Sequence, residues 1–144
     1  TKCALVQRDG DVVDTDGVSP LRFPNMAAGN YYLTIKHRNH IGVMSATPIA
    51  LSQATASWNF TLSAANNYGG ANGAKLLGGG LWGLFSGDVN HNGQVQTTDI
   101  NLLIPQLGLP GYRQTDTNLN GQVQTTDLNL KTIPNLGRGQ QFNN

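Results

Sequence analysis

The sequence predicts a mainly β fold: a small β-sandwich, followed by a short duplicated segment with two short helices. Residues 1–65 hold short runs of β-branched and aromatic residues separated by turn-forming residues, which is typical of strands. Residues 88–144 contain one stretch of sequence twice. The 144 residues can bury a core. We therefore expect a sandwich domain over residues 1–65, a Gly-rich connecting arm over 66–87 and a duplicated module over 88–144.

Five segments of the first region have the composition of strands. They are residues 3–7, 18–23, 31–38, 41–44 and 57–62. In the third segment Tyr31, Leu33 and Ile35 alternate with mainly polar residues. Because successive side chains of a strand point to opposite faces, these three should share the face that packs on the core.

The duplicated stretch runs from Asp88 to Asp99 and again from Asp116 to Asp127. Extended to residues 102 and 130, the copies agree at 12 of 15 positions. Each copy has oxygen-bearing side chains at positions 1, 3 and 5, glycine at 6, an apolar residue at 8 and a carboxylate at 12. Calcium takes six to eight oxygen ligands, and the glycine permits the sharp turn between them. One copy alone could be an Asx-rich turn, but two matched copies predict two calcium sites.

Each predicted site uses side chains, a backbone carbonyl and a water. The first would use the side chains of Asp88, Asn90, Asn92 and Asp99, the carbonyl of Gln94 and a water near Gln96; the second would use Asp116, Asn118, Asn120 and Asp127, the carbonyl of Gln122 and a water near Gln124. With about two charges opposing the ion, we expect dissociation constants of roughly 10⁻⁵ to 10⁻³ M. Such sites stay filled only where calcium is abundant, which favours a structural ion outside the cell.

The acidic residues are gathered in clusters. The chain has eight Asp and no Glu; four Asp lie at the ends of the two loops, and the others are Asp9, Asp11, Asp14 and Asp16. This second cluster is interpreted either as a pair of solvated β-turns or as a third calcium site.

The two loops, with the short apolar segments 100–104 and 128–133 that follow them, resemble the duplicated module of dockerins, whose loops also close with Asp. The resemblance implies calcium binding and a cohesin-like partner. Thr97-Thr98 and Thr125-Thr126 fall where dockerins place their recognition pair. However, Pro105 and Pro134 should end the helices after about two turns, so calcium binding carries over better than cohesin binding.

A second resemblance covers residues 14–35. The segments 14–17, 21–26 and 29–35 are similar to the D-x-D-G…F-x-N-L-x-x-G-x-Y-x-L run of collagen-adhesin B-type and transthyretin-like sandwiches. This resemblance implies an Ig-like or transthyretin-like β-sandwich that serves as a stalk or spacer in a bacterial secreted surface protein.

Composition argues against several classes of function. Charged residues make up 12% of the chain against a usual ~25%, and a net charge of +1 supplies no field for nucleic acid or an anionic membrane. No apolar run reaches the ~20 residues that span a bilayer, and Cys3 alone cannot form an internal disulfide. We expect no catalytic residues: His37, His40 and His91 lack a metal-binding spacing, and the first two should face solvent near a strand end.

The connecting arm alternates glycine with large apolar residues. Leu81, Trp82, Leu84 and Phe85 either dock the calcium module onto the sandwich or stay exposed for a partner subunit. The start at Thr1, without Met or a signal peptide, suggests a mature or trimmed product.

Two functions remain open, both extracellular or at the cell surface. The first is a calcium-stabilised structural module, a repeating subunit of a surface fibre or stalk that self-associates through head-to-tail, non-closing contacts. The alternative is a docking appendage of a larger secreted protein or enzyme.

Overall fold

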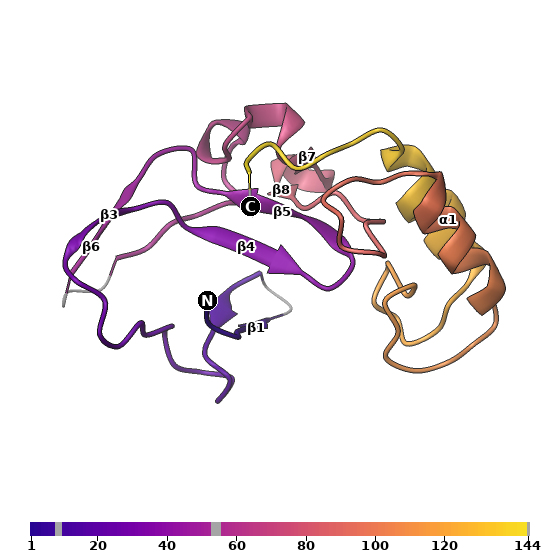
Figure 1. Cartoon of the computed structure of the whole chain (residues 1–144), viewed down its shortest axis with the longest axis horizontal. Helices are drawn as coiled ribbons and strands as arrows, with labels where there is room; N and C mark the ends of the chain where they lie inside the picture. The colour runs from indigo at the N-terminus through magenta and orange to yellow at the C-terminus, as the bar shows by residue number, and fades with distance from the viewer. Residues whose placement is uncertain (8–9, 53–55, 144) are drawn as a thin grey trace. The chain divides into compact units, whose positions relative to one another are not determined.

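The computed structural model describes residues 1–7, 10–52 and 56–143 (Figure 1). Its short strands form two-stranded sheets, consistent with a small, mainly β fold. The strands are β1 (Leu5–Val6), β2 (Val12–Val13), β3 (Gly29–Tyr31), β4 (Thr34–His37), β5 (His40–Met44), β6 (Ile49–Leu51), β7 (Lys75–Leu76) and β8 (Trp82–Gly83). They pair as β1 with β2, β3 with β6, β4 with β5 and β7 with β8.

The helices are short and concentrate in the second half of the chain. The α-helix is α1 (Thr97–Leu103), and η5 (Asp127–Thr132) is a π-helix. The 3₁₀ helices are η1 (Ala64–Asn66), η2 (Gly70–Asn72), η3 (Gly78–Gly80), η4 (Ile104–Gln106) and η6 (Ile133–Asn135). Within the described residues, no helix has the length and apolar character needed to cross a membrane.

Contacts divide the chain into two compact units. One comprises residues 1–30 and 50–56, and the other comprises residues 31–49 and 57–144. The boundaries of these units differ from the predicted domain boundaries, which follow residues 65 and 87. The second unit contains both repeated loops and the β4–β5 hairpin, so the candidate site is described within that unit.

Only part of the predicted strand pattern appears. Residues 31, 33 and 35 are half-buried and alternate with exposed residues, which confirms the predicted face. Residues 18–23 and 57–62 do not form strands, so those two predictions are wrong. In the latter segment, Asn59 Oδ1 accepts hydrogen bonds from the backbone N–H and the hydroxyl of Thr61, both at 2.8 Å. This Asx turn gives the backbone an alternative to a sheet ladder.

A small apolar cluster joins the hairpin to the first repeated loop. Ile41 of β5, Phe85 and Val95 are buried together. Phe85 therefore packs against the β4–β5 hairpin and the first loop, whereas Leu81 of the same arm is 54% exposed. The buried residues also include many polar ones, such as Asn39 and Asn135. Hydrogen bonds between buried polar groups therefore stabilise the fold in addition to the small apolar core.

Candidate metal centre

The carboxylate at position 1 organises each loop. Asp88 accepts the N–H of Asn92 on Oδ1 at 3.0 Å and that of Gly93 on Oδ2 at 3.1 Å. Asp116 accepts the N–H groups at the same positions of the second loop at 3.1 and 2.9 Å. The glycines at position 6 have φ angles of 81° and 87°, a left-handed conformation that a residue with a Cβ adopts only with strain. The loops therefore share the tight turn that the sequence predicted.

The asparagines at position 3 are held by both ends of their amides. Asn90 Oδ1 accepts the backbone N–H of Asn92 at 3.1 Å, and its Nδ2 donates to Thr98 Oγ1 at 3.3 Å. Asn118 makes the same pair of bonds in the second loop, with 3.1 Å to Thr126 Oγ1. Because the threonine takes the amide nitrogen, the amide oxygen is directed into the loop, as a calcium ligand requires.

The carboxylates at position 12, Asp99 and Asp127, are fully buried and bond to the backbone of their own loops. Asp99 Oδ1 accepts the N–H groups of Val89 and Asn90 at 2.8 and 3.1 Å, and Oδ2 accepts that of Gln96 at 2.8 Å. Asp127 accepts the corresponding N–H groups at positions 3 and 9 at 2.8 Å each. A carboxylate offers about four acceptor positions. Both residues therefore support the loop backbone in addition to any role as ligands.

The electrostatics of the first loop favour a bound cation. Burial raises the pKa of the Asp88 carboxyl, and the neighbouring Asp99 carboxylate acts in the same direction. Two buried carboxylates that repel each other lower the stability of the folded loop unless a positive charge compensates them. In the described part of the chain, no three His, Cys, Asp or Glu residues come together as a metal cluster. Each loop instead combines two carboxylates with amide oxygens, a donor set that fits a hard cation such as calcium.

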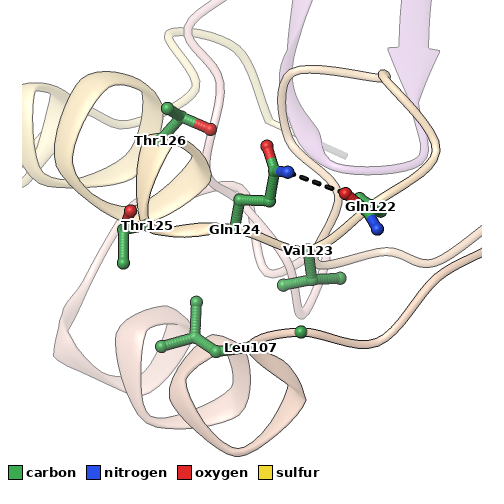
Figure 2. Close-up of a pocket in the computed structure, with 7 residues that line it drawn as sticks. Leu107, Gln122, Val123, Gln124, Thr125 and Thr126 are labelled. Atoms are coloured by element: carbon green, nitrogen blue, oxygen red, sulfur yellow. Dashed lines mark hydrogen bonds between the residues drawn. The ribbon is translucent and has the colours of Figure 1, made fainter.

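The glutamines at positions 7 and 9 bond to each other. Gln124 Nε2 donates to Gln122 Oε1 at 2.7 Å, and Gln96 donates to Gln94 in the same way. Figure 2 shows the bond between Gln124 and Gln122 beside a hollow of about 500 Å³. Leu107, Val123, Thr125 and Thr126 also line this hollow. With these side chains paired, the backbone carbonyl at position 7 and a water near position 9 stay the predicted contributions of these residues to a bound ion.

Each repeat is paired with the segment that follows the other repeat. Val95 of the first loop accepts the N–H of Gly137 and donates to the carbonyl of Arg138, both at 2.9 Å. Val123 of the second loop makes the equivalent bonds with Gly108 and Leu109, at 2.7 and 3.0 Å. Helices α1 and η5 lie side by side (Figure 1). The two predicted sites therefore belong to one interlocked structure.

The turn between β4 and β5 contacts the second loop. Asn39 is fully buried, and its Nδ2 donates to the carbonyls of Gln114 and Asp116 at 2.9 and 2.7 Å. Arg38 Nη2 lies 3.9 Å from Asp116 Oδ2, and its guanidinium carbon lies 3.5 Å from the centre of the Tyr112 ring. Sequence reasoning missed Asn39 and Arg38, because nothing in a turn after a predicted strand indicates a partner so far along the chain.

The two histidines of this turn differ from expectation. His37 and His40 are half-buried, with ring centres 4.6 Å apart in an edge-to-face arrangement. The prediction that both face solvent is wrong, because the turn packs within the second unit. Burial lowers the pKa of His40 to about 3. His91 is exposed at loop position 4, as expected for a residue that is not a ligand.

The acidic cluster near the amino terminus forms hydrogen-bonded turns. Asp14 pairs with Lys2, and Asp16 Oδ1 accepts the N–H groups of Val18 and Ser19 at 3.0 and 2.8 Å. A hydrogen bond from the side chain of Ser19 is the main reason that the pKa of Asp16 falls to about 2, and the two backbone N–H groups act in the same direction. Asp9 lies outside the described residues. This geometry is that of solvated turns, and the alternative of a third calcium site at Asp9, Asp11, Asp14 and Asp16 stays a prediction.

Comparison with known proteins assigns no family to the chain. Neither a scan against protein-family models nor searches of curated proteins and of solved structures found a match.

Proposed function

We propose that this chain is an extracellular, calcium-stabilised structural module of a bacterial surface protein. In this proposal, the first region acts as a small Ig-like or transthyretin-like sandwich, and the repeats act as a dockerin-like module with two bound calcium ions. The observation that carries the proposal is the hydrogen-bond geometry that the two loops share. The position 1 carboxylate, the position 3 amide and the position 12 carboxylate have matching backbone partners in both.

Calcium would act here as a fastener. Asp88, Asn90, Asn92 and Asp99, with the Gln94 carbonyl, would hold one ion, and the equivalent residues of the second loop would hold the other. Because the two loops are interlocked through residues 95 and 123, an ion in either loop would stiffen both. A ligand that binds only the folded state raises its stability by RT ln(1 + [L]/Kd), so weak sites contribute where calcium is plentiful.

Assembly into a fibre is supported by the amino-terminal strand. β1 pairs only with β2 among the described residues, and its Leu5 and Val6 are 47% and 56% exposed. An unpaired strand edge is a template for strand addition by a second copy. With a net charge of +1, copies would approach one another without strong repulsion.

Calorimetric titration with calcium tests the metal sites. Asp88→Asn with Asp116→Asn keeps the size of both side chains but removes one charge from each loop, so binding of both ions should be lost. Asn101→Ala is the control, because it changes an exposed side chain outside the loops and should leave both ions bound. Two ions bound by the doubly substituted protein with unchanged affinity would show that the ligand assignment is wrong.

Docking to a partner is the second candidate function. The helical segments after the loops expose apolar side chains, with Leu102 at 46%, Leu130 at 63% and Ile133 at 42% exposure. Negative-stain microscopy with and without calcium separates the two candidates. Filaments that form only with calcium support the structural module. A persistent monomer that binds a cohesin-like domain supports the docking appendage instead.

A further inference from the structure

The two repeats share their loop geometry but not their surroundings. Arg38 Nη2 stands 3.9 Å from Asp116 Oδ2, which is the first ligand position of the second loop. The side chain of Arg38 is 16% exposed and that of Asp116 is 2% exposed, so little water screens the pair. At the first loop, neither Asp88 nor Asp99 has an ion-pair partner among residues 1–7, 10–52 and 56–143.

The guanidinium of Arg38 is held in place from several sides. It stacks on the ring of Tyr112, and the next residue, Asn39, is anchored by two hydrogen bonds to the second loop. Its Nη1 atom is buried without a hydrogen-bond partner in the described structure. A buried donor with no partner is costly, and the electrostatic attraction of Asp116 compensates for part of that cost. The charge is therefore fixed beside the loop and cannot withdraw freely when another cation arrives.

We propose that Arg38 makes the two calcium loops unequal, so that the first loop binds calcium more tightly than the second. This inference rests on the proposed calcium binding and adds an order of filling to it. Arginine stays charged at any relevant pH. In the second loop it supplies part of the positive charge that the carboxylates need, and it repels an incoming divalent ion. The second loop is thus ordered without metal and fills last, whereas the first loop depends on its ion.

The coupling also runs in the opposite direction. If Arg38 weakens calcium at the second loop, calcium there must weaken the attraction between Arg38 and Asp116 by the same free energy. Filling of the second loop would therefore loosen the β4–β5 turn, and the calcium concentration at which this happens lies above the one that fills the first loop.

Calcium titration of the whole chain, followed by NMR, tests this inference. The amides of Gly93 and Gly121 bond to Asp88 and Asp116, so each reports on its own loop without any substitution. In the unaltered protein Gly93 should reach its midpoint at a calcium concentration at least about fivefold below that of Gly121. Arg38→Gln should lower the Gly121 midpoint by about tenfold, the scale of a unit charge acting through a partly screened site. It should leave Gly93 within about twofold.

Two further variants control for general charge effects. Arg113→Gln removes an exposed guanidinium that bonds to the carbonyl of Pro110, so it should leave both midpoints within about twofold. Arg38→Lys keeps the charge and should keep the order of filling. Equal midpoints in the unaltered protein, or a Gly121 midpoint that Arg38→Gln leaves in place, would overturn the inference while calcium binding stands. If neither glycine responds to 20 mM calcium in the folded protein, the calcium proposal and this inference both fall.

Discussion

The two repeats begin with nearly the same loop and end with differently wound helices. Four residues separate Asp99 from the Ile-Pro pair that follows it, and five separate Asp127 from its own Ile-Pro pair. In α1 the N–H of Ile104 reaches the carbonyl four residues back, whereas in η5 the N–H of Ile133 reaches the carbonyl of Leu128, five residues back. The wider π turn accommodates the extra residue. Helix winding thus adapts, while the loops and the pairing between repeats stay matched.

The π turn also preserves which residues face inward. Asp99 and Leu103, four residues apart in α1, are fully buried, and so are Asp127 and Thr132, five residues apart in η5. Thr132 Oγ1 donates to the carbonyl of Asp127 at 2.9 Å, which ties the two buried ends of the turn together. A regular α-helix would have rotated the residue after the insertion by about 100° away from the core.

The repeats also differ in their contacts with the β4–β5 turn. Asn39 of this turn donates hydrogen bonds to Gln114 and Asp116, at the start of the second repeat. Asn39→Ala should lower the free energy of unfolding by about 2–5 kcal/mol, because the buried carbonyl of Asp116 and the part-buried carbonyl of Gln114 lose their donor. Chemical denaturation measures the loss, and hydrogen exchange should show Gly121 less protected than Gly93. The exposed Asn101→Ala is the control and should change stability by no more than about 0.5 kcal/mol. Equal loss of protection in both loops would contradict the anchoring role.

Acid should lower the stability of the folded chain through His40. The pKa of His40 is about 3 in the folded chain and 6.5 as a free side chain, so the unfolded chain takes up the proton first as pH falls. Stability is therefore fully present above pH 6.5 and decreases below it, by about 3 kcal/mol between pH 6.5 and 4. Unfolding measured across this range should show a flatter dependence for His40→Gln. A similar slope in that variant would exclude His40 as the source.

The origin of the π turn can be tested by changing the register. Deleting Leu130, which is exposed, should let η5 wind as an α-helix and change stability by no more than about 1 kcal/mol. Inserting one alanine after Leu102 in α1 should be tolerated in the same way by forming a π turn. Amide resonances of Val95 and Val123 would show whether the pairing between repeats survives. A deletion as damaging as Asn39→Ala would mean that the π turn itself is required.

The smallest expected effect concerns Tyr112, which contacts Arg38 beside the second loop. Tyr112→Leu should lower stability by about 0.5–1 kcal/mol, because the ring is 87% exposed and a cation–π contact with an exposed ring contributes little. Thermal melts measure the change, and Tyr68→Leu serves as the control, because no cation of the described residues stacks on that ring. In an Arg38→Gln background the effect of Tyr112→Leu should disappear, and a persistent effect would assign it to the ring alone.

The tight turns of the two loops could be predicted from the sequence because each is built from residues within one short segment, whereas calcium binding by them stays a prediction. Asp88 bonds to N–H groups four and five residues away, and Asp99 to one only three residues away. The strands were harder to predict: the segment at residues 57–62 has the composition of a strand, but Asn59 forms a turn there. The Asn39 bond to Asp116 spans 77 positions, and no local pattern indicates it. The extra residue before Ile133 was visible in the sequence and would have indicated the π turn.

The crossed pairing of the repeats has a consequence for biosynthesis. Val95 bonds to Gly137 and Arg138, which leave the ribosome more than forty residues after it. The second repeat finds its partners at Gly108 and Leu109 as soon as it emerges. The repeat made later is thus completed earlier, and the nascent chain carries an unfinished first repeat until residues 137 and 138 are translated.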